Sequence, residues 1–179
     1  MSTALSLVAE LERVARALET EDAGGVQPSL LSIAEKIART MGVRQEEVAI
    51  LGVSSKWKHL HFIVPEALKN VGFIPLSSNS ALAAKTVRES RPEIDNKFSA
   101  ARHANVFENI KLSGETQELI QKIISAPILF DGKVIGVIQI SRKGVNTSSV
   151  GPDFTSDDLG NLLALCKPLG KFVRRAAGE

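Results

Sequence analysis

Residues 125–144, SAPILFDGKVIGVIQISRKG, constrain the fold more than any other stretch of the chain. Two apolar runs flank Asp131-Gly132, and Asp-Gly between β-forming runs is a strong signal for a hairpin with a two-residue turn. Such a turn pairs residues across the hairpin as Phe130 with Lys133, Ile128 with Ile135 and Ala126 with Val137. Both faces of this hairpin are apolar, so helices must cover one face, and helices or a ligand must cover the other.

The expected register divides the hairpin side chains between the two faces. The face of Ala126 also carries Ile128, Ile135 and Val137, and the opposite face carries Ile123, Leu129, Val134, Ile138 and Ile140. A proline cannot donate a hydrogen bond to a neighbouring strand. We therefore expect a bulge or a gap in pairing at Pro127, opposite Gly136.

The N-terminal third of the chain predicts two helices. Residues 2–20 have apolar side chains three and four apart, which form a seam that needs a packing partner: Ala4, Leu7, Leu11, Val14 and Leu18. A glycine- and proline-containing hinge over 21–28 separates this helix from a second one, which follows Pro28 and is capped by Gly42.

Short strands, one helix and a long irregular stretch are expected before the hairpin. Residues 46–54 and 57–65 are typical of strands, 65–72 form a brief helical turn, and 73–80 form a loop. A helix over 79–90 takes Ser78 or Asn79 as its N-cap and ends before Pro92. The polar stretch over 93–115 is predicted to be irregular, and loops of this length are usually functional or mobile.

The C-terminal segment predicts a final helix. Thr155 and Asp158 have the spacing of a capping box, which opens a helix with the apolar stripe Leu159, Leu162, Leu163 and Cys166. Pro168 should kink or interrupt it, and Leu169, Phe172 and Val173 continue the apolar face.

Composition narrows the classes of function. The chain has 179 residues, a formal net charge of +2 and scattered basic residues, which is too weak a bias to favour nucleic acid. The single cysteine, Cys166, excludes an internal disulfide and a CxxC metal site. The N-terminus lacks the apolar core of a signal peptide, and no apolar run could span a membrane. We therefore expect a cytoplasmic protein that binds neither nucleic acid nor membranes.

The order of these elements resembles the GAF family of small-molecule-sensing domains over roughly residues 28–175. The likeness is clearest in APILFDGKVIGVIQI, in FTSDDLGNLLALC and in NSALAAKTVRESRPEID, which is similar to the helix and acidic loop over the family's pocket. The resemblance implies an α+β, GAF/PAS-like antiparallel sheet, with N- and C-terminal helices on one face and a ligand pocket under a helix and loop roof on the other. It divides the chain into a dimerisation helix with its linker, 1–25, and a GAF-like domain, 26–177.

Several activities known in this family can be weighed against the residues present. Free methionine sulfoxide reductases are the enzymatic alternative, but their chemistry needs a thiolate and further cysteines to resolve the sulfenic acid. Cys166 lies on an apolar stripe, where a small core residue is the favoured interpretation, and no thiol is placed to attach a bilin. The pattern of cyclic-nucleotide-binding domains is also incomplete, because Arg142-Lys143 replaces Asn-Lys.

The histidines give no clear catalytic constellation. His59 and His61 are two apart on an expected strand, where a solvated or edge face is favoured over a metal pair. His103, in the polar stretch, is the better candidate for contact with a ligand or for haem ligation. No cofactor and no metal are expected.

The predicted ligand-binding residues lie around the expected roof. Ser78 and Ser80 sit at a helix N-terminus, which favours a polar or anionic ligand, although simple capping explains them equally well. Asp95 and Asn96 stand where the resemblance places the acidic loop. The remaining candidates are Phe98 and Phe107, as an apolar wall, and His103.

These observations predict a non-enzymatic GAF domain that senses a small molecule and signals as a homodimer through residues 2–20 and 155–175 to a downstream protein. A ligand that orders residues 94–112 would shift the terminal helices. A redox enzyme and a ligandless interaction scaffold, whose pocket is filled by its own side chains, remain the alternatives.

Overall fold

The computed structural model describes residues 3–17, 29–98 and 119–176. The helices are α1 (Thr3–Ala17), α2 (Leu30–Met41), α3 (Leu82–Glu89) and α4 (Ser156–Ala176), and the strands are β1 (Val48–Ser54), β2 (His59–Val64), β3 (Phe73–Pro75), β4 (Glu93–Asp95), β5 (Leu119–Phe130) and β6 (Lys133–Gly144). Short 3-10 turns at Gln45–Glu47, Glu66–Leu68 and Thr147–Ser149 connect them.

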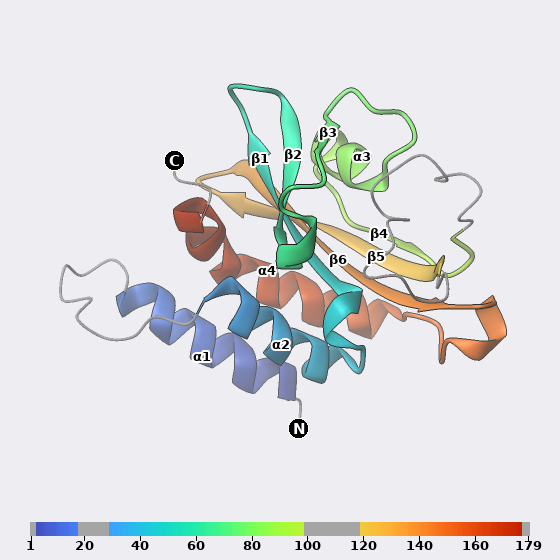
Figure 1. Cartoon of the computed structure of the whole chain (residues 1–179). Coiled ribbons are helices and arrows are strands. Elements are labelled where there is room, and N and C mark those ends of the chain that lie inside the picture. Colours follow the sequence, from blue (N-terminus) through green and yellow to red (C-terminus); the bar gives the residue numbers. More distant parts are fainter. Residues whose placement is uncertain (1–2, 18–28, 99–118, 177–179) are drawn as a thin grey trace.

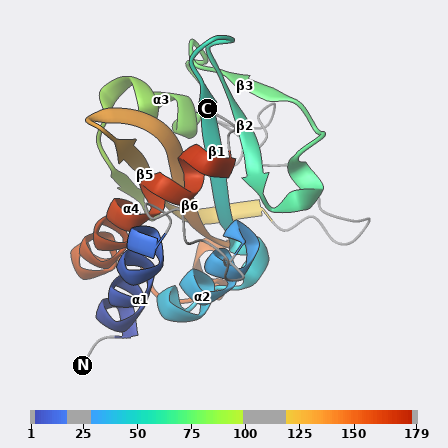
Figure 2. The ribbon, with the colours of Figure 1, turned by 90° about the vertical axis from the view of Figure 1, so that its left-hand side faces the viewer.

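The strands form one antiparallel sheet in the order β3-β2-β1-β6-β5-β4. Helices α1, α2 and α4 form a layer on one face of the sheet, and α3 lies on the other face (Figures 1 and 2). This architecture confirms the predicted α+β fold. We refer to the two faces as the helix-layer face and the α3 face.

The β5–β6 hairpin turns at Asp131-Gly132 as expected, and both residues have positive φ angles, 49° and 76°. Phe130 pairs with Lys133, but Ile135 is an extra residue on β6, so Ala126 pairs with Ile138 rather than with Val137. The expected pairings beyond Leu129 were therefore wrong by one residue. The bulge lies between Ile128 and Leu129, beside the expected position, and Pro127 is paired with Val137.

The bulge reverses the faces of the β6 side chains that follow it, relative to the expected register. Ile138 and Ile140 face the helix layer together with Ala126 and Ile128, whereas Val137 lies in the core under α3. A slip of one residue turns every later side chain to the other face, and here both faces are apolar enough to accept it.

The terminal segments form the helices that the sequence predicts. The seam of α1 is buried against α4 and α2 of the same chain, with Ala4, Leu7 and Leu11 at most 5% exposed. Helix α2 begins after Ser29, whose hydroxyl accepts from the Ser32 amide, and ends at Gly42 with φ 68°. The capping box of α4 is confirmed, since the Thr155 amide donates to Asp158 and the Asp158 amide donates to Thr155 Oγ1.

Helix α4 is continuous through the buried Pro168, so the proline does not interrupt it. Leu163, expected on the apolar stripe, is 39% exposed, and Leu165 is buried in its place. Of the other stripe residues, Leu159 is half-buried, and Leu162, Cys166, Leu169, Phe172 and Val173 are buried as expected.

Three local predictions before the hairpin were wrong. Residues 73–75, expected as a loop, form the edge strand β3, and residues 93–95, expected as irregular, form the edge strand β4. Helix α3 begins at Leu82 with Ala81 as its N-cap, three residues later than expected. Ser78 instead caps the turn before the helix, because its hydroxyl accepts from the Ala81 amide at 3.1 Å.

Among the described residues, none of the helices combines the length and the apolar character needed to cross a membrane.

Candidate functional site

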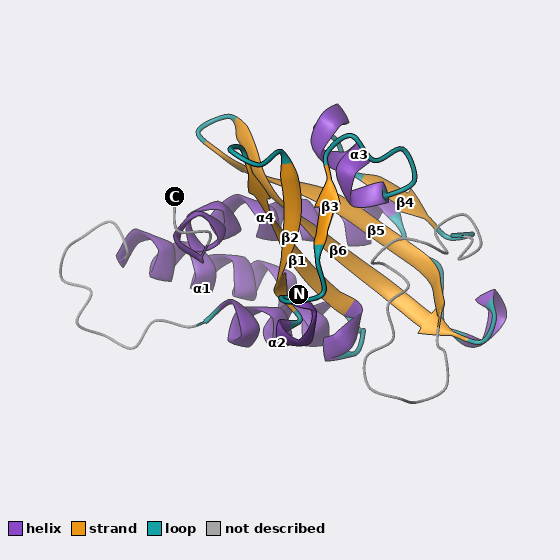
Figure 3. Cartoon of the chain, turned by 45° about the horizontal axis from the view of Figure 1, so that its top comes forward, coloured by secondary structure: helices purple, strands orange, loops and turns teal. Residues whose placement is uncertain are grey.

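A cavity of about 270 Å³ opens on the α3 face, between the start of α3 and the edge strand β4. Figure 3 shows these two elements side by side at one end of the sheet. The residues that line the cavity are Asn79, Ser80, Ala81, Leu82, Lys85, Glu93, Asp95 and Phe98. Three residues predicted to bind a ligand, Ser80, Asp95 and Phe98, are therefore brought to one cavity, which we call the roof cavity.

The charged side chains of the roof cavity come from two facing elements. Lys85 on α3 donates to Glu93 on β4 at 2.9 Å, and both side chains are about 40% exposed. Glu93 and Asp95 are two apart on one strand, so they share a face of it. Among the described lining residues Lys85 is the only cation, so this part of the lining carries one more negative than positive charge. A bound ligand with N–H or ammonium donors is therefore favoured electrostatically.

Sequence reasoning missed Lys85 and Glu93. The signal for Glu93 was its position two residues before Asp95. This spacing places both side chains on one face only if the segment is a strand, and the sequence favoured an irregular segment. Lys85 lies one turn into α3, three residues after Leu82, and this spacing turns both side chains to the same side of the helix.

The two predicted serines lie close to each other before α3, and one of them lines the cavity. Their hydroxyl oxygens lie 3.4 Å apart, and Ser80 lines the cavity. Ser78 is half-buried and already accepts the Ala81 amide, so capping explains it. Ser80 is exposed and is the serine better placed to reach a ligand.

Asn96 is engaged in fixing the backbone. Its Oδ1 accepts from the Phe154 amide at 2.8 Å, and its Nδ2 donates to the Phe154 carbonyl at 3.0 Å. Both ends of the side-chain amide are thereby used to tie the segment after β4 to the residues before α4. Asp95 Oδ1 accepts the Lys97 amide at 2.9 Å, an Asx turn that leaves Oδ2 without a recorded partner among the described residues.

Phe98 supplies an apolar wall, as predicted. It is 4% exposed and forms a small cluster with Leu82, Ile120 and Ile123. The other two candidates, His103 and Phe107, lie outside the described residues. Their predicted contacts with a ligand stay predictions.

A smaller void of about 30 Å³ on the α3 face is lined in part by Phe62, Ile123 and Gln139, and it leaves room for about one water molecule. Gln139 donates to Ser125 Oγ at 3.3 Å, and Ser125 shares a 2.7 Å hydrogen bond with Thr86 on α3. This buried polar chain fixes α3 on the sheet and leaves the roof cavity as the more spacious site on this face.

The single cysteine lies on the other side of the sheet. Cys166 packs in the core between the sheet and the helix layer, and burial raises the pKa of its thiol to about 12. The thiol is therefore protonated near neutral pH and has no contact with the roof cavity.

The histidine pair lies near the β3 edge of the sheet, in agreement with the expected edge face. Both imidazoles are half-buried, their centroids are 6.3 Å apart, and His59 stacks on Phe73 at 4.1 Å. In residues 3–17, 29–98 and 119–176, no three His, Cys, Asp or Glu side chains are grouped as a metal ion would need.

Solved structures similar to this one include a GAF domain, a chemotaxis protein and a reductase. The GAF domain of an Acinetobacter phosphoenolpyruvate-protein phosphotransferase superposes with a TM-score of 0.63 at 15% identity, covering 99% of this chain and 97% of that one. A methyl-accepting chemotaxis protein gives 0.60 at 13% identity, with coverages of 95% and 96%. A free methionine-R-sulfoxide reductase from Neisseria meningitidis, in complex with its substrate, gives 0.58 at 16% identity, with coverages of 98% and 90%.

Sequence comparison is less informative. No protein-family model matches the chain. A phenylalanine–tRNA ligase beta subunit from Borrelia recurrentis is 19% identical over 138 residues, which is 77% of this chain, and the chain spans about a quarter, 23%, of that relative. The chain has the fold of a GAF domain, and a chemotaxis protein and a free methionine-R-sulfoxide reductase have similar folds.

Proposed function

We propose that this chain is a non-enzymatic sensory GAF domain that binds a small polar ligand in the roof cavity. The observation that carries the proposal is the separation of the thiol from the cavity by the whole thickness of the sheet. The cavity offers Ser80, Asp95 and the Lys85–Glu93 pair for recognition. It offers no thiolate, which the sulfoxide reductase reaction would need as its nucleophile.

The reductase is the second candidate, because a structure of that enzyme is among the similar folds. One assay separates the two candidates. We expect the full chain to show no turnover of free methionine-R-sulfoxide with a thiol reductant, and Cys166→Ser to behave as the wild type. Turnover that is lost in Cys166→Ser would establish the enzyme and overturn the proposal.

Ligand binding needs its own test, because a ligandless scaffold would also fail the reductase assay. Native mass spectrometry of the full chain, purified without denaturation, is expected to show a small molecule retained by the wild type. Asp95→Asn should weaken binding of the ligand about tenfold to a hundredfold and so lower its occupancy, since a hydrogen bond to a charged group contributes about 1.5–3 kcal/mol. Lys97→Gln, at an exposed neighbour outside the cavity lining, is the matched control. Mass spectra without any adduct would favour the scaffold.

We further propose that the domain signals as a homodimer through its terminal helices to a downstream protein. The α1 seam is covered within the chain, so the remaining apolar contacts are Leu5 on α1 and Leu163 on α4, which are 59% and 39% exposed. Light scattering is expected to give a dimer mass that falls to the monomer mass in Leu5→Lys/Leu163→Lys. A wild type that is monomeric at high concentration would contradict the dimer.

A further inference from the structure

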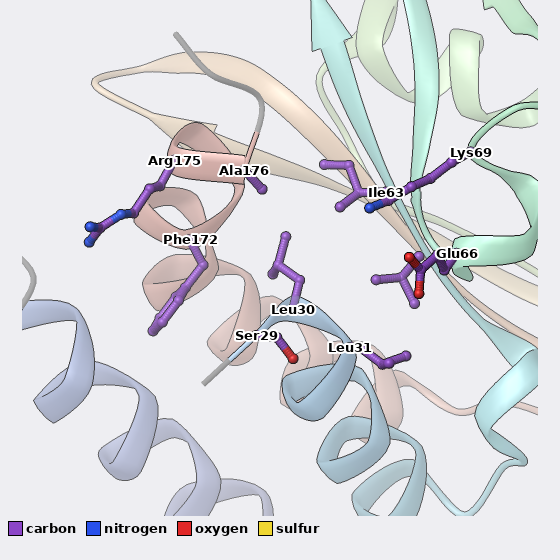
Figure 4. Close-up of a pocket in the computed structure, with 10 residues that line it drawn as sticks. Ser29, Leu30, Leu31, Ile63, Glu66, Lys69, Phe172, Arg175 and Ala176 are labelled. Atoms are coloured by element: carbon purple, nitrogen blue, oxygen red, sulfur yellow. The ribbon is translucent and has the colours of Figure 1, made fainter. Parts of the chain in front are cut away.

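A second and larger cavity lies on the helix-layer face of the sheet, remote from the roof cavity (Figure 4). Its volume is about 400 Å³. It is bounded by the start of α2, the end of β2 with the 3-10 turn that follows, and the last turn of α4. This volume lies within the usual range for small-molecule sites, about 300–1,000 Å³.

The walls of this cavity are mainly hydrocarbon. Leu30 from α2, Ile63 from β2 and Ala176 from α4 surround the open space in Figure 4. Leu30 and Ile63 belong to the buried core, each 9% exposed, so their positions are fixed by packing behind them. An apolar chain that entered here would be removed from water without rearrangement of the core.

One end of the cavity is electropositive. Lys69 extends its ammonium group toward the space beside Ile63 (Figure 4), and it has no ion-pair partner among the described residues. The first backbone N–H groups of α2, at Leu30 and Leu31, have no acceptor inside their helix, and the helix dipole adds positive potential. Arg175 also lines the cavity, but its guanidinium group points away from the gap.

Glu66 is the one acidic side chain among the described residues of the lining. Like Lys69, it is exposed to solvent, so screening weakens the interaction of either side chain with an ion. Because Arg175 points away, the charges of Lys69 and Glu66 balance beside the space, and the start of α2 supplies the remaining positive potential. Positive potential beside an apolar space favours a ligand with a negative head and an apolar tail.

We propose that this cavity binds an amphipathic carboxylate of the medium-chain fatty acid class. The carboxylate lies at Lys69 and the start of α2, and the tail lies between Leu30, Ile63 and Ala176. Because the site joins α2 to the last turn of α4, its occupant would hold the C-terminal helix to the sheet. The proposal concerns the opposite face from the roof cavity and does not depend on the ligand proposed there.

Lys69 and Glu66 are exposed and lie on one turn, so removing the charge of each in turn tests the proposal without disturbing the fold. Decanoate is titrated into the full chain by calorimetry, and Lys69→Gln should weaken its affinity about fivefold, since partly exposed ion pairs contribute up to about 1 kcal/mol. Glu66→Gln should instead strengthen it by a smaller factor. Both side chains are exposed, and Lys167→Gln, at an exposed lysine on α4 outside the cavity, should leave the affinity unchanged.

The location and the sign of the ligand charge are tested separately. Amide NMR shifts on adding decanoate should centre on residues 29–31, 63–69 and 172–176, and decylammonium should bind more weakly than decanoate. The proposal is overturned if decanoate does not bind, if the shifts centre on α3 and β4, if Glu66→Gln weakens decanoate binding, or if decylammonium binds as tightly as decanoate.

Discussion

At the scale of the residue, Asn96 shows how a polar side chain predicted to meet a ligand can serve the backbone instead. Both its hydrogen bonds go to the peptide groups of Phe154, 58 positions away in the sequence. They tie the loop before α4 to the end of β4, and so hold one wall of the roof cavity in place through the neighbouring Asp95 and Phe98.

We expect Asn96→Ala to lower the free energy of unfolding by about 1–3 kcal/mol, because the Phe154 peptide groups then lose two partners in a part-buried setting. Urea denaturation measures the change. Asn70→Ala, at an exposed asparagine outside both the cavities and the core, is the control and should change stability by less than about 0.5 kcal/mol. Equal effects of the two substitutions would show that the Phe154 contacts contribute nothing.

The Cys166 thiol leads to a prediction about reactivity and pH. Its pKa is raised to about 12 by burial, against an ordinary value of 9.0, so the native thiol is protonated at pH 8. We expect Ellman's reagent to leave the native protein unmodified at pH 8 and to modify the thiol fully in guanidinium chloride. Rapid modification of the native protein would place the thiol at the surface.

The same raised pKa gives the protonated thiol a stabilising role with a defined pH window. The folded state holds the thiol proton more tightly than the unfolded state does. This contribution is present below about pH 9 and is lost as the pH rises toward 12. The free energy of unfolding of the wild type should therefore fall faster above pH 9 than that of Cys166→Ala, whereas parallel curves would contradict the burial.

At the scale of the element, the sequence predicted the hairpin and its turn but could not predict the register beyond the bulge. Periodicity assigns a register when one face is polar, since a slip then exposes apolar groups. Val137 and Ile138 are both apolar, and both faces of β6 are covered, so either register satisfied the pattern. Only part of the roof cavity could be predicted, because its lining also depends on strand pairing. Asp95 and Ser80 were recognised as polar groups beside α3, but Glu93 joins them only once β4 is known to pair with β5.

Strand β6 passes close to β1 and α4 at Gly136. A Cβ there would lie 2.7 Å from the Leu51 carbonyl oxygen on β1 and 3.0 Å from Val173 on α4. The carbonyl belongs to a paired central strand and cannot move away cheaply. We expect Gly136→Ala to destabilise the protein by about 1–3 kcal/mol in urea denaturation.

A matched glycine separates this clash from the general effect of alanine. Gly160 lies inside α4 with open space where its Cβ would be, so Gly160→Ala should stabilise the protein by about 0.5–1 kcal/mol. If Gly136→Ala and Gly160→Ala change the free energy of unfolding in the same direction, then a Cβ at position 136 does not clash with β1.

At the scale of the whole molecule, α1 belongs to the same core as the sheet. Its seam is buried as predicted at Ala4, Leu7 and Leu11, and Leu18 lies outside the described residues. A seam in sequence does not say whether its partner is the same chain or a second copy. In the structure Leu7, Leu11 and Ala15 join the cluster that contains α2, α4 and the helix-layer face, and Glu10 forms an ion pair with Lys36 on α2. The terminal helices are thus coupled directly to the sheet, and through it to both cavities.

The partner of the α1 seam can be settled by the concentration dependence of stability. Leu11→Ala removes a side chain that is 2% exposed, and we expect a loss of about 2–5 kcal/mol from the free energy of unfolding. Because the contacts lie within one chain, this loss should be the same at micromolar and at tenfold higher protein concentration in chemical denaturation. A seam buried between two copies would behave differently, since its contribution to stability would grow with protein concentration by mass action. The exposed Leu5, on the same helix, supplies the control. Leu5→Ala should leave the free energy of unfolding of the monomer unchanged and should alter only that part of the stability that depends on protein concentration.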